Sequence, residues 1–237
     1  KVVAHMMPNL LWSTPEKDKE SLARVFDDQS FRPDELKIYP MVVTDKSELT
    51  EIWKAWWFTP YNDETLINLT ADLEEMIPEY VRLNRTYRDI PASEILAWSH
   101  VSNLRQIVEE KIKNKWVTLV DIRHREIKAK WNDPKNAVIH TYKYEASDWI
   151  EYFLTMEDKF DRTIFSLLRF RIPSDSKNDN LSFNDDVKKL HELIPEIKNS
   201  SLIREIHTFG DQLNVWETWN KFGEHIWFWK TLIAEAE

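Results

Sequence analysis

The stretch Leu202–Leu232, LIREIHTFGDQLNVWETWNKFGEHIWFWKTL, decides the fold class of this chain. Leu202–Phe209 has the apolar and β-branched content of a strand, and Ile226–Ala236 has the content of a helix after a polar loop. A strand, loop and helix in this order present unpaired helix N–H groups that favour a bound phosphate. Phosphate-binding loops use glycine for close approach, whereas Trp227 and Trp229 stand at the corresponding places here.

This stretch and others resemble one known family. EHIWFWKTL (Glu224–Leu232) looks like the acyl-CoA pyrophosphate loop of GNAT acetyltransferases, with tryptophan at both glycine positions. IREIHTFG (Ile203–Gly210) is similar to a strand of the catalytic subunit of Elongator, a radical-SAM enzyme that modifies tRNA uridine. Upstream segments resemble the same family in the same order: KVVAHMMP (Lys1–Pro8), FRPDELKIYP (Phe31–Pro40), the pair Trp53-Lys54, RDIP (Arg88–Pro91), SNLRQ (Ser102–Gln106), IRHRE (Ile122–Glu126) and LLRFRIP (Leu167–Pro173). The chain is therefore identified as a member of the Elongator catalytic-subunit family.

Hydrophobic periodicity predicts an α/β fold. Strands are expected at 1–7, 36–44, 81–88 and 117–127, with helices at 15–27, from 45 onward, at 63–77 after the N-cap Asn62, and at 101–114. A meander of strands at 137–145, 149–157 and 163–173 then precedes a helix at 185–198. The resemblance implies the carboxy-terminal half of a radical-SAM (partial TIM-type) barrel at 1–93, a basic linker at 94–135, and the first part of a GNAT acetyltransferase domain at 136–237.

The resemblance also implies three cofactors, namely acetyl-CoA, S-adenosylmethionine and a [4Fe–4S] cluster. The chain contains no cysteine, so it carries no ligands for the cluster and forms no disulfide. For acetyl-CoA, the strand residues His207, Thr208 and Phe209 are expected to run along the pantetheine. The pyrophosphate loop is expected to comprise Glu224, His225, Ile226, Trp227, Phe228, Trp229 and Lys230.

Glu205 and His207 are the predicted catalytic residues. They occupy alternate positions of one strand, so their side chains are expected on the same face. A histidine beside a carboxylate can act as a general acid or base. The alternative is a hydrogen-bonded pair that supports the sheet, and the sequence favours that alternative.

Basic residues predict a contact with tRNA. The segment 105–130 carries eight lysines and arginines against four acidic residues, although the whole chain has a net charge of −9. A basic run is also typical of a solvated surface, and Lys37 is equally compatible with a barrel mouth or an ion pair. The resemblance favours RNA contacts by Lys37, Arg88, Arg105, Arg123 and Arg125. Some relatives bind zinc near the IRHRE strand, but this chain has Leu119, Asp121 and His124 there, so we predict no metal.

Glycine and tryptophan occur in unusual numbers. The chain has two glycines and twelve tryptophans, whereas an average composition would give about 17 glycines. Several tryptophans stand where the family has glycine or where a turn is expected, including Trp12, Trp116, Trp227 and Trp229. We hypothesise that the gene encodes glycine with UGA, which the standard code translates as tryptophan. The alternative is a diverged or engineered chain that truly carries these tryptophans.

These observations predict part of an acetyl-CoA-dependent enzyme that makes a carboxymethyl-type modification on the tRNA wobble uridine by radical SAM chemistry. As it stands, this chain is expected to be inactive. Alternatives are a non-catalytic RNA-binding or scaffold remnant and a GNAT N-acetyltransferase acting on proteins or amines. The expected partners are tRNA and acetyl-CoA, together with a second copy of the chain or Elongator-type subunits. With no apolar run of about 18 residues and no signal-peptide pattern, we expect a cytoplasmic protein without a membrane contact.

Overall fold

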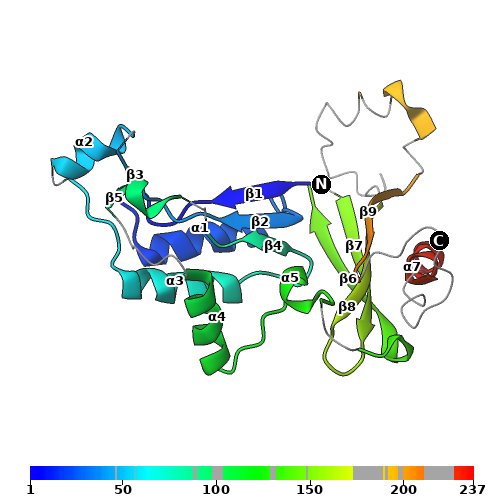
Figure 1. The fold of residues 1–237 in the computed structure, drawn as a ribbon. Coiled ribbons are helices and arrows are strands. Elements are labelled where there is room, and N and C mark those ends of the chain that lie inside the picture. The colour runs from blue at the N-terminus through cyan, green and yellow to red at the C-terminus, as the bar shows by residue number, and fades with distance from the viewer. Residues whose placement is uncertain are drawn as a thin grey trace. The chain divides into compact units, whose positions relative to one another are not determined.

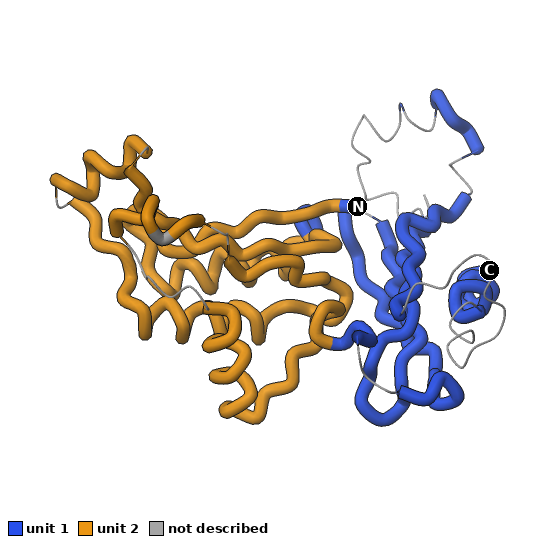
Figure 2. Tube along the Cα trace, viewed as in Figure 1, with its two compact units in different colours: residues 1, 29–31, 125–237 blue, residues 2–28, 32–124 orange. Residues whose placement is uncertain are grey.

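A computed structural model describes residues 1–45, 47–55, 57–87, 90–97, 104–128, 132–147, 149–172, 189, 192–196, 200–210 and 227–237. The predicted helix 185–198 lies mostly outside these ranges, and the loop 211–226 lies wholly outside them. The chain forms two compact units, which Figure 2 colours separately. One contains residues 2–28 and 32–124, and the other contains residues 1, 29–31 and 125–237.

The first unit contains a three-stranded parallel sheet in the order β1-β2-β4 (Figure 1). Its strands are β1 (Val3–Met6), β2 (Glu35–Ile38) and β4 (Arg82–Arg85). Leu36 and Ile38 are fully buried, whereas Lys37 between them is half-buried, as expected when alternate side chains face opposite sides of a sheet. The parallel pairing confirms the predicted mixed α/β fold. A barrel is not formed by the described strands, so the barrel half stays a prediction.

Helices alternate with these strands as the periodicity predicts. They are α1 (Pro15–Asp27), α2 (Leu49–Lys54), α3 (Asp63–Glu75) and α4 (Leu104–Asn114). The side chain of Asn62 accepts a 2.8 Å hydrogen bond from the Thr65 N–H, which confirms Asn62 as the N-cap of α3. The leucines Leu66, Leu69 and Leu73 of α3 are at most 2% exposed and form its buried stripe.

The predicted strand 36–44 is interrupted. It consists of β2 and a separate two-residue strand, β3 (Val43–Thr44), which pairs antiparallel with β5 (Ile95–Ala97) after the short 3₁₀ helix Ala92–Glu94. Pro40 lies between the two strands, and proline has no N–H to donate to a ladder. The interruption therefore has a local cause.

The predicted strand 117–127 is wrong. Residues Ile122–Arg125 form one helical turn, α5, and Glu126 then makes an isolated bridge with Ile164. The carboxylate of Asp121 accepts a 3.0 Å hydrogen bond from the Arg123 N–H. A side chain that satisfies a nearby backbone donor in this way begins a helical turn and competes with strand pairing.

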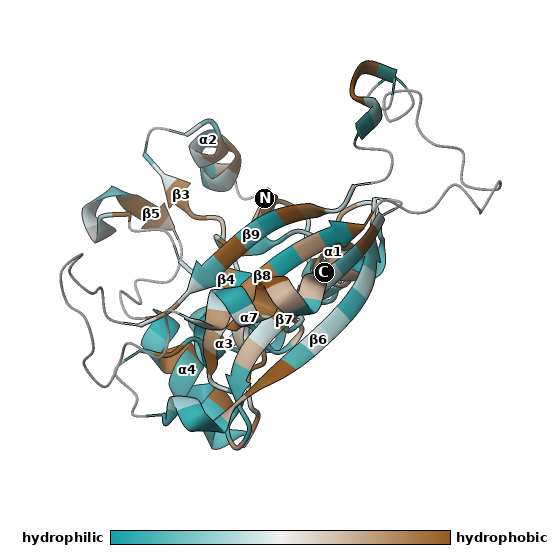
Figure 3. Ribbon diagram, turned by 90° about the vertical axis from the view of Figure 1, so that its right-hand side faces the viewer, coloured by the Kyte–Doolittle hydropathy of each residue, from teal (hydrophilic) through white to brown (hydrophobic). Residues whose placement is uncertain are grey.

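The second unit contains a four-stranded antiparallel sheet in the order β6-β7-β8-β9, which confirms the predicted meander. The strands are β6 (Ala137–Ala146), β7 (Trp149–Asp158), β8 (Ile164–Ile172) and β9 (Leu202–Thr208), and the 3₁₀ helix Pro134–Asn136 leads into them. Hydrophobic and hydrophilic bands alternate along these strands in Figure 3. This alternation is typical of a sheet whose two faces have different neighbours.

Helix α7 (Phe228–Ala236) covers one face of this sheet (Figure 3), and it confirms the helix predicted after the loop. Its Phe228 ring lies 5.5 Å from the ring of Phe165 on β8, and Leu232 is fully buried in the same cluster. The apolar side of α7 therefore fixes the helix on the sheet. No helix in the described part of the chain has the length and hydrophobicity needed to cross a membrane.

Candidate functional site

Strand β9 carries the residues that were predicted to contact the pantetheine of acetyl-CoA. It is the edge strand of the sheet among the described strands, so one side of its backbone has no strand beside it there. On its paired side, the hydroxyl of Ser166 donates to the His207 carbonyl at 2.9 Å, and the Phe209 N–H donates to the Phe165 carbonyl at 2.8 Å. An edge strand offers main-chain donors and acceptors to an extended ligand.

The predicted pair of Glu205 and His207 does not form a hydrogen bond. Both carboxylate oxygens of Glu205 are engaged elsewhere, since Arg169 Nε lies 2.9 Å from one and Lys1 Nζ lies 2.8 Å from the other. The ring of His207 instead lies 4.4 Å from the ring of Phe209. This arrangement agrees better with a carboxylate that stabilises the sheet than with a general acid or base.

The ion pairs also control the charge of Glu205. Burial alone would raise the pKa of this carboxyl, but Lys1 and Arg169 outweigh burial and hold the pKa below its usual value. Glu205 is therefore ionised at neutral pH and remains paired. A catalytic role for Glu205 and His207 stays a prediction.

The first turn of α7 bears the described part of the predicted pyrophosphate loop. Glu224, His225 and Ile226 lie outside the described residues, whereas Trp227 to Lys230 are described. Trp227 precedes the helix as its N-cap and makes no side-chain capping bond. The Lys230 ammonium lies 4.0 Å from the centre of the Trp227 ring and 5.5 Å from that of Trp229. Such distances are typical of cation–π contacts.

These residues do not fit the pyrophosphate of acetyl-CoA. A phosphate must approach the first N–H groups of a helix closely, which is why glycine is used at such places. Here Trp227 and Trp229 are 54% and 37% exposed, so their rings cover the surface near the start of α7. The sequence alone raised this conflict, and the structure retains it.

A basic row crosses the parallel sheet of the other unit. His5, Lys37 and Arg85 are register partners on β1, β2 and β4, near the carboxyl ends of these strands. The ring of Tyr39 lies edge-on to that of His5 with the ring centres 5.5 Å apart. Lys37 has no ion pair with any described residue, which argues against the ion-pair alternative for it. Ligands of parallel α/β sheets bind beyond the carboxyl ends of the strands.

The other residues predicted to bind tRNA differ in accessibility. Arg88 lies outside the described residues. Arg105 pairs with Glu109 at 2.8 Å on the surface of α4, and its side chain is 39% exposed. Arg123 is half-buried, and its Nη1 donates to the Asn84 carbonyl at 3.0 Å. Arg125 is only 5% exposed and pairs with Glu157, so an RNA contact would require this buried pair to break.

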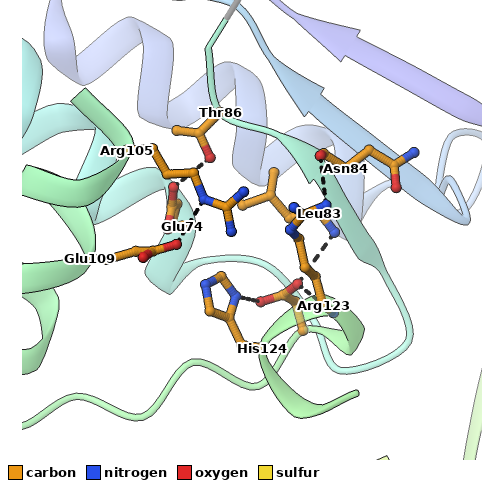
Figure 4. A network of polar contacts seen from close by, with 9 residues as sticks. Glu74, Leu83, Asn84, Thr86, Arg105, Glu109, Arg123 and His124 are labelled. Carbon is orange, nitrogen blue, oxygen red and sulfur yellow. Dashed lines mark hydrogen bonds and ion pairs between the residues drawn. The ribbon is translucent and has the colours of Figure 1, made fainter. Parts of the chain in front are cut away.

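A buried polar cluster joins α3, β4 and α5 in the first unit (Figure 4). Asp121, which is 1% exposed, accepts a hydrogen bond from the Leu83 N–H at 3.3 Å and contacts Nδ1 of His124. Glu74, which is 2% exposed, accepts a 2.7 Å hydrogen bond from the Thr86 hydroxyl. Two further side-chain atoms of this cluster, Glu74 Oε2 and His124 Nε2, are buried without a hydrogen-bond partner.

Burial and neighbouring charges shift both groups toward their protonated forms. Burial raises the pKa of the Glu74 carboxyl to about 7. For His124, burial opposes the charged form, but Asp121 and the nearby Glu74 and Glu109 outweigh burial and raise the pKa of the imidazole. Hydrophobic periodicity does not reveal this cluster, although Glu74 directly follows Leu73 of the apolar stripe of α3. A carboxylate at such a position is a usable indication of a buried polar site.

No group of three metal-ligating side chains occurs among the residues that the structure describes. The absence of a metal site therefore stays a prediction.

Known proteins resemble this chain in sequence and in fold. The radical-SAM C-terminal domain family matches residues 33–114. The tRNA uridine(34) acetyltransferase of Dehalococcoides mccartyi is 34% identical over all of this chain and 49% of its own length. Elongator complex protein 3 of Saccharomyces cerevisiae is 29% identical over all of this chain and 41% of its own length. The solved structure of Methanocaldococcus infernus Elp3 with an N-terminal deletion matches with a TM-score of 0.80 and 30% identity, over all of this chain and 54% of that one.

The parallel sheet, the antiparallel sheet and the match over residues 33–114 define a mixed α/β protein that contains a radical-SAM C-terminal domain region. More narrowly, the chain belongs to the family that contains the tRNA uridine(34) acetyltransferases and Elongator complex protein 3. It spans about half the length of the curated relatives it matches.

Proposed function

We propose that this chain is part of an enzyme that modifies uridine 34 of tRNA with a carboxymethyl-type group. The observation that carries the proposal is the match of the whole chain to tRNA uridine(34) acetyltransferases in sequence, together with a TM-score of 0.80 to an Elp3 structure. The domain division at residues 93 and 135 belongs to this proposal, as do a homodimer or Elongator-type partner subunits.

The cofactors of the family are only partly compatible with this chain. S-adenosylmethionine and a [4Fe–4S] cluster would supply a radical, but a chain without cysteine has no thiolate ligands for that cluster. Acetyl-CoA would supply the acyl group, and the start of α7 does not fit its pyrophosphate. We therefore propose no chemical step for the isolated chain, which is expected to be inactive.

The residues of this chain are proposed to bind and position tRNA. His5, Lys37 and Arg85 form a row where ligands of parallel sheets bind, and Lys37 has no ion-pair partner among the described residues. Arg105 adds a partly exposed charge on α4. Phosphate contacts supply most of the affinity for a nucleic acid, so cations such as Lys37, Arg85 and Arg105 can hold RNA despite the net charge of −9.

A tRNA-binding titration of the Lys37→Ala variant tests this proposal. We expect weaker binding of a tRNA that has uridine at position 34. The slope of log affinity against log salt concentration should also become smaller in magnitude by about one, because one phosphate contact is lost. Lys54→Ala is the matched control, since Lys54 is exposed and pairs only locally with Glu51 on α2. Equal losses in both variants, or no tRNA binding by the parent chain, would contradict the proposal.

A second candidate function is that of a non-catalytic RNA-binding protein. The cation–π stack of Lys230 on Trp227 and Trp229 favours it, because this stack occupies the acyl-CoA loop. Binding of tRNA without any acetyl-CoA affinity would support this second function. Competition between acetyl-CoA and tRNA would support the enzyme.

A further inference from the structure

The start of α7 differs from a phosphate-binding helix terminus in a specific way. The apolar side of the helix is fixed on the sheet by Phe228 and Leu232, so the position of its first turn is determined. The exposed side of that turn carries two indole rings with one ammonium group over both. The N-cap supplies no side-chain acceptor, so the first N–H groups are not satisfied by a capping side chain.

We propose that Trp227 and Trp229 close the acyl-CoA phosphate site in this chain, and that glycine at both positions opens it. This inference rests on the proposed function, because the family resemblance is what assigns a phosphate to this turn. The two rings hinder the close approach that a phosphate needs. They also hold the Lys230 ammonium in a cation–π contact, where part of its attraction for an anion is already used.

Two other tryptophans support the same inference from backbone geometry. Trp12 has φ 61° and is 71% exposed, and Trp116 has φ 59° and is 95% exposed. Positive φ is unfavourable for a bulky side chain and free of penalty for glycine. Trp116 follows the end of α4, where a left-handed glycine commonly ends a helix. Tryptophan therefore stands at two positions with glycine-like backbone geometry elsewhere in the chain. Trp227 itself has a helical φ of −89°, so at the start of α7 the argument rests on the bulk of the rings and not on the backbone.

Calorimetric titration with acetyl-CoA tests the inference on the full chain. We expect the variant Trp227→Gly/Trp229→Gly to bind acetyl-CoA at least about tenfold more tightly than the parent chain, because a helix terminus then accepts the pyrophosphate. Acetyl-pantetheine, which lacks the pyrophosphate, should show no comparable gain. Lys230→Met is the matched control, and it should show no gain because both rings remain.

Three results would overturn the inference. They are equal affinity of parent and variant for acetyl-CoA, an equal gain for acetyl-pantetheine, and no binding by the variant. Circular dichroism and a melting curve establish that the variant is folded, and Trp227→Ala/Trp229→Ala provides a second variant with better helix propensity. The alanine variant should show a smaller gain than the glycine variant. If the proposed function is wrong, neither the parent chain nor any variant should bind tRNA. That result is distinct from a failure of this inference, which concerns acetyl-CoA affinity alone.

Discussion

Trp12 and Trp116 hold backbone conformations that suit glycine. Trp12 is the third residue of a turn in which the Ser13 N–H donates to the Leu10 carbonyl at 2.9 Å. At that place a positive φ calls for a residue without a Cβ atom. Both rings are largely exposed, so their removal sacrifices little buried surface. The conformational penalty is therefore not offset by packing.

We predict that Trp12→Gly and Trp116→Gly each raise the free energy of unfolding by about 1 kcal/mol, since glycine adopts positive φ without strain. Urea denaturation measures this change. Trp53→Gly is the control, because Trp53 lies in α2 and packs against the cluster of Met41, Val43 and Phe58, so glycine should lower stability by more than about 1 kcal/mol. A loss of stability in all three variants would show that the tryptophans at positions 12 and 116 are not strained.

At the scale of elements, the buried cluster links α3, β4 and α5. The Ile122 N–H donates a hydrogen bond to the Val81 carbonyl at 3.0 Å. The carboxylate of Asp121 accepts a hydrogen bond from the Leu83 N–H and contacts the ring of His124. Glu74 and His124 both have raised pKa values, so the folded chain binds these protons more tightly than the unfolded chain. The contribution of Glu74 is therefore fully present below the ordinary carboxyl pKa of 4.5 and is lost as the pH rises through about 7, and that of His124 is fully present below 6.5 and is lost as the pH rises through its own raised pKa.

We predict that Glu74→Gln makes stability less dependent on pH. In the parent chain, ionisation of Glu74 should reduce the free energy of unfolding by about 3 kcal/mol between roughly pH 5 and pH 9. Glutamine keeps an acceptor for the Thr86 hydroxyl but does not ionise, so this loss should be smaller in the variant. Urea denaturation at stepped pH provides the measurement. Parallel pH profiles for both proteins would mean that Glu74 is already ionised at acidic pH.

At the scale of the whole molecule, the tryptophans and the scarcity of glycine have one common explanation. If UGA encodes glycine in this gene, the tryptophans at positive φ and those at the glycine places of the acyl-CoA loop should share that codon. We predict UGA codons for Trp12, Trp116, Trp227 and Trp229, and UGG for Trp53, which matches a family tryptophan. Reading the gene sequence decides the matter. UGG at all five positions would leave a chain that truly carries these tryptophans.

The local sequence determined most elements of both units. Helix α1, helix α3 with its N-cap Asn62, and the strands β6 to β9 were all predictable. Each depends on the spacing of apolar residues or on a cap within a few positions, and such patterns act through near neighbours. The conflict at Trp227 and Trp229 was also visible in the sequence, because the loop pattern itself calls for glycine.

Only the tertiary structure decided the roles of Asp121, Glu74 and Arg125. Segment 117–127 has strand composition, yet the carboxylate of Asp121 accepts the N–H of Arg123 and so begins the helical turn α5. The same carboxylate accepts a hydrogen bond from the N–H of Leu83, which is 38 residues away. Glu74 accepts a hydrogen bond from Thr86, and burial raises its pKa while the charge of His124 lowers it, although the three residues are far apart in the sequence. Arg125 forms an ion pair with Glu157 inside the second unit. The sequence determined which residues are apolar, charged or able to cap. Folding decided which charges are buried together, because burial and pairing depend on residues that are distant in the chain.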